Sequence, residues 1–146
     1  MPTPVNGIGA LYYSLAIGTP AWVALTSYAA TLKVSGGDLQ TGEFVSFEDD
    51  GFPYIGAGNF EPHEIAVRLL FTAGTTEPYA VLRAAYLAKT PILLRWSYGS
   101  GSAPYYRTKD ATYLINVPFP EADSGSADPL AVEITLKAGE IEYKAS

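Results

Sequence analysis

TTEPYAVLRAAYLAKT, residues 75–90, is the one stretch of this 146-residue sequence whose pattern predicts a helix. Thr75 or Thr76 is a suitable cap, and Glu77 favours the positive end of the helix dipole. Pro78 is tolerated in the first helical turn, where its missing N–H has no partner to lose. A single helix in a chain that is otherwise rich in strand patterns, with no recognisable catalytic constellation, favours a β-sandwich that works through its edges and loops over an enzyme.

One face of this helix is apolar, so we expect the helix to pack as a structural brace and to carry no chemistry. The apolar positions are Val81, Leu82, Ala85 and Tyr86. Arg83 falls off this stripe. Lys89 suits the C-terminal end of the helix, and Pro91 stops it.

Outside the helix, alternation of apolar and polar residues predicts roughly eight strands. They are drawn from nine candidate segments, at residues 13–17, 30–34, 43–48, 64–71, 92–98, 105–108, 113–117, 132–138 and 141–144. In the clearest, residues 132–138, we expect Val132, Ile134, Leu136 and Ala138 to point inward. Most connections are too short for helical crossovers, which favours antiparallel pairing. The prediction is a mainly β fold: an antiparallel sandwich or barrel-like domain with one packed helix and long inter-subunit loops.

The composition indicates one ordered domain over residues 1–146, with residues 1–24 the least certain part of it. Hydrophobic residues make up 48% of the chain and charged residues only 16%. With so few ions to cover the surface, some apolar or aromatic surface is expected to be buried against a partner chain. The apolar stretch near the N-terminus is short and broken by Ser14, Gly18 and Pro20, which fits neither a signal peptide nor a membrane span.

The formal net charge of −6 argues against tight binding of nucleic acid, which depends on Lys and Arg neutralising phosphates. The negative charge is compatible with a surface that DNA passes without adhering. The chain has no cysteine, so disulfides and thiolate metal sites are excluded.

Residues 49–62, DDGFPYIGAGNFEP, form an irregular segment by their glycine and proline content, and regular strand pairing is not expected there. The segment is also too apolar for a surface loop that only connects two strands. It is either a loop folded back on its own core or a docking arm for another subunit. The residues expected to serve such an arm are Asp49, Asp50, Phe52, Tyr54, Ile55 and Phe60.

No catalytic, cofactor or metal constellation stands out, so we expect neither an enzyme nor a cofactor. His63 lies near Glu61 and Glu64, but a lone histidine at the start of a strand is more often a capping or surface residue. A GxSxG motif and a glycine-rich phosphate loop are absent from the sequence. The acidic run at residues 48–50 lacks EF-hand spacing and is typical of a solvated turn.

The order of these segments resembles that of the tail tube proteins, or major tail proteins, of long-tailed bacteriophages, over about residues 25–144. The matching segments are SGGDLQTGEFVSF (35–47), GFPYIGAGNFEP (51–62), EIAVRLLF (64–71), EPYAVLRAAYLAK (77–89), WSYGSGSAPYYR (96–107) and YLINVPFPEADSGSADPLAVEITLKAGEIEY (113–143).

The resemblance implies a β-sandwich whose copies close into hexameric rings, which stack into a tube that conducts DNA into the host. It implies that the long loop around residues 44–60 reaches the next ring, and that a tape measure protein and a tail terminator are further partners. The chain would be a virion tail component assembled in the host cytoplasm, with DNA in transit rather than tightly bound and no membrane insertion.

The resemblance and the negative charge together imply a mostly acidic lumen. The candidate residues are Glu43, Glu48, Asp49, Asp50, Glu133, Glu140 and Glu142. A different class stays open: a monomeric sandwich that binds carbohydrate through some of its eleven tyrosines. A third, weaker alternative is a tail terminator or a needle-type injection tube.

Overall fold

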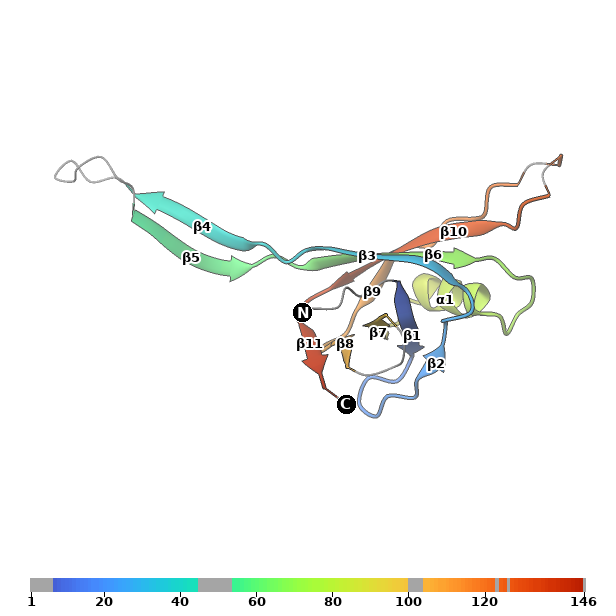
Figure 1. Ribbon diagram of the computed structural model, residues 1–146, viewed down its shortest axis with the longest axis horizontal. Helices are drawn as coiled ribbons and strands as arrows, with labels where there is room; N and C mark the ends of the chain where they lie inside the picture. The colour runs from blue at the N-terminus through green and yellow to red at the C-terminus, as the bar shows by residue number, and fades with distance from the viewer. Residues whose placement is uncertain (1–6, 45–53, 100–103, 123, 126, 146) are drawn as a thin grey trace, which may run out of the picture.

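The computed structural model describes residues 7–44, 54–99, 104–122, 124, 125 and 127–145, and Figure 1 shows their arrangement. Antiparallel sheets and one helix make up the described fold, and the sheets do not close into a barrel within those residues. The mainly β, antiparallel fold with one helix is therefore confirmed.

A five-stranded sheet has the order β11-β8-β7-β1-β2. Its strands are β1 (Ile8–Ser14), β2 (Val23–Ala24), β7 (Leu93–Tyr98), β8 (Tyr105–Thr108) and β11 (Ile141–Lys144). The first strand lies earlier than the sequence pattern predicts. Leu15 and Ile17, expected inside it, lie beyond its end and are exposed, because the chain turns at Ser14, whose hydroxyl oxygen accepts from the N–H groups of Ala16 and Ala21.

A four-stranded sheet has the order β3-β6-β10-β9. Its strands are β3 (Ala29–Gly36), β6 (His63–Leu70), β9 (Tyr113–Asn116) and β10 (Ala131–Ala138). The alternation expected in residues 132–138 is confirmed, because β10 buries its apolar positions and exposes Glu133 and Lys137. In β9 the core residue is Leu114, while Tyr113 and Ile115 face outward.

The hydrophobic core lies between the two sheets. Leu11, Leu94 and Trp96 of the five-stranded sheet belong to the same buried cluster as Val67 and Ile134 of the four-stranded sheet. Each of these side chains is at most 2% exposed. Facing sheets with apolar inner surfaces define a β-sandwich.

Helix α1 (Pro78–Leu87) completes the core. Leu82 and Ala85 of the expected apolar stripe are buried, and Val81 and Tyr86 pack against the core cluster in part. The helix also buries Pro78 and Tyr79, which the stripe did not include. Both belong to the first turn, where the chain enters the sandwich.

The predicted threonine caps are wrong. The N-cap residue is Glu77, and it makes no side-chain capping bond. Its carboxylate instead accepts hydrogen bonds from the hydroxyls of Thr72, at 3.0 Å, and Tyr28, at 3.3 Å. The charge of Glu77 and this hydrogen bond raise the pKa of the Tyr28 hydroxyl. Glu77 thus ties the start of the helix to the segments beside β3 and β6.

A third, two-stranded sheet pairs β4 (Leu39–Phe44) with β5 (Tyr54–Phe60). It projects from the sandwich as a long arm, at the left of Figure 1. The expectation that residues 49–62 lack regular pairing is wrong for residues 54–60, where Gly56 and Gly58 take extended conformations within β5. In an exposed ribbon a glycine forfeits no core packing, so its presence does not prevent strand formation.

Candidate functional site

The β4–β5 arm is the first candidate for an assembly surface, because its described residues are exposed on both faces. Ile55 is 67% exposed and Phe60 is 73% exposed, which is unusual for large apolar side chains. A two-stranded hairpin in water is marginally stable on its own. An arm of this kind therefore gains stability when another surface covers it.

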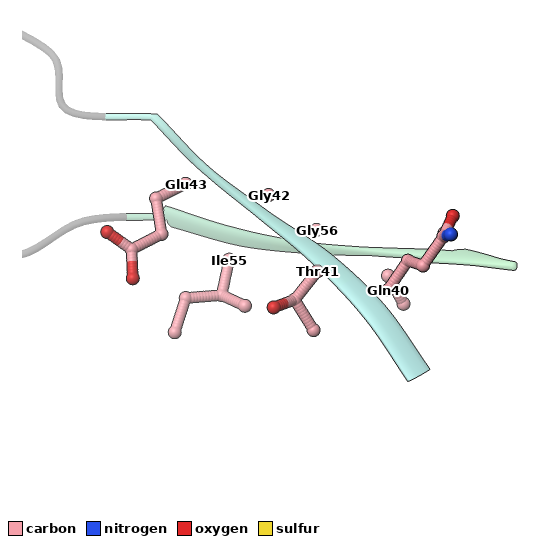
Figure 2. Close-up of a pocket in the computed structure, with 8 residues that line it drawn as sticks. Gln40, Thr41, Gly42, Glu43, Ile55 and Gly56 are labelled. Carbon is pink, nitrogen blue, oxygen red and sulfur yellow. The ribbon is translucent and has the colours of Figure 1, made fainter. Parts of the chain in front are cut away.

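One side of the arm combines charged, polar and apolar groups. Glu43 and Ile55 are cross-strand partners, and Figure 2 shows their side chains on the same side of the ribbon as Thr41. Gly42 and Gly56 also pair directly, and a Cβ built at either would meet nothing within 4 Å. These two glycines leave bare backbone, which another chain can approach closely.

The base of the arm is fixed by two glycines and a histidine. Gly36 and Gly37 have φ values of 78° and 75°, in the left-handed region that favours glycine. A Cβ at Gly36 would lie 2.5 Å from the carbonyl oxygen of Pro62, and one at Gly37 would collide with the ring of His63. His63 Nδ1 donates to the carbonyl oxygen of Gly139 at 2.8 Å. The lone histidine therefore positions the arm relative to the turn after β10.

The edges of the four-stranded sheet are the second candidate. Within the described residues, β3 pairs only with β6, and β9 pairs as a strand only with β10. A strand edge carries unpaired N–H and C=O groups that accept a further strand. Because the two edges lie on opposite sides of one sheet, the sheet is suited to head-to-tail joining of copies.

The outward face of this same sheet is close to charge balance. Its exposed ionic residues are Lys33, Glu64, Arg68, Glu133 and Lys137. Glu133 pairs in register with Arg68, and Lys137 pairs with Glu64. Opposite charges at such cross-strand positions are mildly stabilising. Lys33 has no charged partner in register, because it stands opposite Ala66.

The structure does not bring the predicted acidic residues together. Glu43 is on the arm, Glu133 on the four-stranded sheet, and Glu142 on β11 of the other sheet. Glu140 lies in the turn between β10 and β11. Glu48, Asp49, Asp50 and Phe52 lie outside the described residues, and Tyr54 is described only as the first residue of β5.

Two of these carboxylates already have partners within the chain. Glu140 forms an ion pair with Lys109 at 3.2 Å, and Glu142 forms one with Lys144 at 3.5 Å. The hydrogen bond and the charge of Glu140 raise the pKa of Lys109. Both pairs are solvent-accessible, so their contribution to stability is small.

Three tyrosines gather at one end of the five-stranded sheet without forming a flat platform. Tyr106 lies between Tyr98 and Tyr143, with ring centroids 5.8 Å and 5.3 Å away and ring planes inclined by 66° and 58°. A sugar ring stacks on exposed aromatic faces, whereas these rings turn their edges and faces toward one another.

Among the residues described, no three His, Cys, Asp or Glu side chains cluster as metal ligands would. The only helix of that part of the chain, α1, is far too short to span a membrane.

Of the comparisons with known proteins, the one with solved structures finds matches, and these agree on the fold. No family model matches the sequence, and no curated protein matches it. Among solved structures, a chain in the baseplate of the anti-feeding prophage has a TM-score of 0.68 at 12% identity, with 98% of this chain and 97% of that chain covered. A chain in the cap that terminates the anti-feeding prophage tube has a TM-score of 0.64 at 14% identity, with 100% and 94% covered.

A chain in the virion of a native gene transfer agent particle has a TM-score of 0.65 at 11% identity, with 92% of this chain and 95% of that chain covered. At such identities the likeness shows a shared fold, which here extends over nearly the whole of both chains. The fold is thus one used by components of phage-tail-like particles.

Proposed function

We propose that this chain is a structural subunit of the tube of a phage tail or a phage-tail-like particle. Copies join edge to edge through β3 and β9 into hexameric rings, and the rings stack into a tube. The observation that carries this proposal is the β4–β5 arm, an ordered ribbon that exposes Ile55 and Phe60 and has no core of its own. The shared fold with chains of tube caps, baseplates and virions supports it.

The two kinds of surface suit two kinds of contact. Edge pairing between β9 and β3 of the next copy is a head-to-tail contact that closes when the rotation per copy divides a full turn. Stacking is open-ended, and the β4–β5 arm reaches far beyond the sandwich (Figure 1). In this proposal the arm contacts a neighbouring ring, and Ile55 and Phe60 are its described anchors.

Electron microscopy of the purified protein, combined with sedimentation over a range of concentrations, tests the proposal. A tube subunit gives rings and stacks of rings whose length grows with concentration. A terminator gives single rings that do not stack. A sharp monomer at every concentration, with other tail components present as well as absent, contradicts the proposal and favours the sugar-binding alternative.

We further propose that the outward face of the four-stranded sheet lines the bore and that DNA or another cargo passes it without adhering. Glu64 and Glu133 are the carboxylates of this face, and each stands opposite a cation. A lining of neutralised pairs offers phosphates few free cations, and tight DNA binding requires many of them in parallel. Assembled tubes are expected to retain no duplex DNA at low salt, and salt-sensitive retention contradicts this lining.

The remaining partners follow from the same proposal. A tape measure protein inside the tube and a terminator at its end are expected, and the assembled chain belongs in the virion tail after assembly in the host cytoplasm.

A further inference from the structure

Two arginines stand side by side on the face of the five-stranded sheet that points away from the core. Arg95 of β7 and Arg107 of β8 are direct cross-strand partners. Their neighbours continue the row, with Tyr12 of β1 opposite Arg95 and Glu142 of β11 opposite Arg107. Leu94 and Trp96 of β7 point into the core, which places Arg95 on the outer face.

Aromatic rings hold the two guanidinium groups in place. The Arg95 guanidinium carbon is 3.9 Å from the ring centroid of Tyr105 and 5.2 Å from that of Tyr12. The ring of Trp22 lies 5.8 Å from Arg95 and 5.6 Å from Arg107. Cation–π contacts orient a guanidinium without using its N–H donors. The pair is therefore rigid and has donors left over.

The pair has no countercharge of its own within the described residues. Like charges directly opposite on neighbouring strands destabilise a sheet. Glu142, the carboxylate best placed to relieve this repulsion, forms its ion pair with Lys144 instead. Arg107 Nε donates to the carbonyl oxygen of Thr108 at 3.3 Å. Two half-buried guanidinium groups without a carboxylate are an arrangement that a bound anion stabilises.

We propose that this Arg95–Arg107 site binds an acidic segment of a protein partner, with one carboxylate of the segment on each guanidinium. The planar fork of arginine matches a carboxylate bidentately, and the rings packed on the two guanidinium groups leave them only partly exposed to water. Nucleic acid fits less well, because two arginines neutralise too few phosphates and the chain as a whole is negative. The site lies on the five-stranded sheet, whereas the four-stranded sheet is the one proposed to join copies into a ring, so binding to the site can be measured on the unassembled subunit.

Fluorescence anisotropy on the unassembled subunit tests this directly. The probe is a fluorescein-labelled hexaglutamate peptide, with hexaserine and six-nucleotide oligothymidine probes as comparisons. Saturable binding of hexaglutamate that weakens with salt is expected. Arg95→Gln and Arg107→Gln are each expected to weaken it by about tenfold or more, since unpairing one member of a desolvated charge pair loses at least that factor.

Arg68→Gln is the matched control, because Arg68 is an exposed arginine on the other sheet. It is expected to change hexaglutamate binding by less than about twofold, as for a rim charge outside the site. Arg107→Lys, which keeps the charge and loses the planar fork, is expected to fall between wild type and Arg107→Gln, and it serves as the second variant if a glutamine variant fails to fold.

Thermal unfolding separates a binding role from a structural one. If the pair serves a ligand, Arg107→Gln removes a repulsion and leaves the Tm of the free protein unchanged or higher. A lower Tm with unchanged peptide binding overturns the proposal. So does an equal loss in Arg68→Gln, no binding of hexaglutamate, or tighter binding of the oligothymidine.

Discussion

The arm and the helix are elements of similar size whose surroundings differ completely. Helix α1 buries Pro78, Tyr79, Leu82 and Ala85 within the chain. The β4–β5 arm exposes each residue whose burial is described, including Ile55 and Phe60. The helix is stabilised from within the subunit, whereas the arm lacks any comparable internal support. The comparison indicates that the chain divides into a part whose apolar side chains fold the subunit and an exposed arm, which in the proposed function joins subunits.

The largest expected effect is a loss of stability when a buried side chain of the helix is truncated. Leu82 is 1% exposed, so Leu82→Ala is expected to lower the free energy of unfolding by about 2–5 kcal/mol. Leu87 of the same helix is 66% exposed, and Leu87→Ala is expected to change it by less than about 0.5 kcal/mol. Urea unfolding of both variants measures the difference. Equal losses of unfolding free energy in the two variants would contradict the assignment of Leu82 to the buried face and Leu87 to the exposed face of the helix.

The arm is expected to show the reverse behaviour. Truncating a buried interface aromatic commonly costs about 2 kcal/mol or more of binding free energy. Ile55→Ala combined with Phe60→Ala is therefore expected to block stacking of rings while the unfolding transition of the free subunit stays in place. Sedimentation and urea unfolding measure the two properties separately.

Phe119→Ala is the matched control for the arm, because Phe119 is 72% exposed against 73% for Phe60. Phe119 lies under the guanidinium of Arg83, with 3.9 Å between the guanidinium carbon and the ring centroid, and it is remote from the arm in sequence. It is expected to leave stacking intact. Full-length tubes from the arm double variant would show that the exposed apolar residues of the arm are not its anchors.

A smaller effect is expected at the start of the helix. Glu77→Ala removes the carboxylate that accepts from Tyr28 and Thr72, and it is expected to lower the free energy of unfolding by about 1 kcal/mol. Glu121→Ala, at an exposed position of a loop, is the control. No difference between the two variants means that the helix is held by its apolar face alone.

The smallest effect concerns alkaline pH. Burial raises the pKa of the Tyr13 hydroxyl above its ordinary value of 10.0. The folded state then holds this proton more tightly than the unfolded state. The contribution of the Tyr13 proton to the free energy of unfolding is therefore complete below pH 10 and is lost as the pH rises further. Tyr13→Phe is expected to lose less stability than wild type between about pH 9 and pH 11. Identical slopes for the two proteins contradict a buried, protonated Tyr13.

The body of the fold is largely predictable from sequence because its signals are local. Alternation in β10 and the stripe around Leu82 report on a core that the chain itself provides. The arm is less predictable from sequence, because the glycines of residues 54–60 normally indicate a loop. They are compatible with a strand only where, as here, the strand does not pack into a core. The Arg95–Arg107 pair was missed altogether, since it depends on the register of β7 with β8 and on Trp22 from a distant segment.

Hydrogen exchange of the arm tests most directly the claim that neighbouring copies complete it. In the dissociated subunit, amides of β4 and β5 are expected to exchange fast while those of β6 and β10 are protected. After assembly the arm amides are expected to become protected and the amides of β6 and β10 to stay as they were. Slow exchange of the arm already in the dissociated subunit, or no added protection on assembly, would contradict this account.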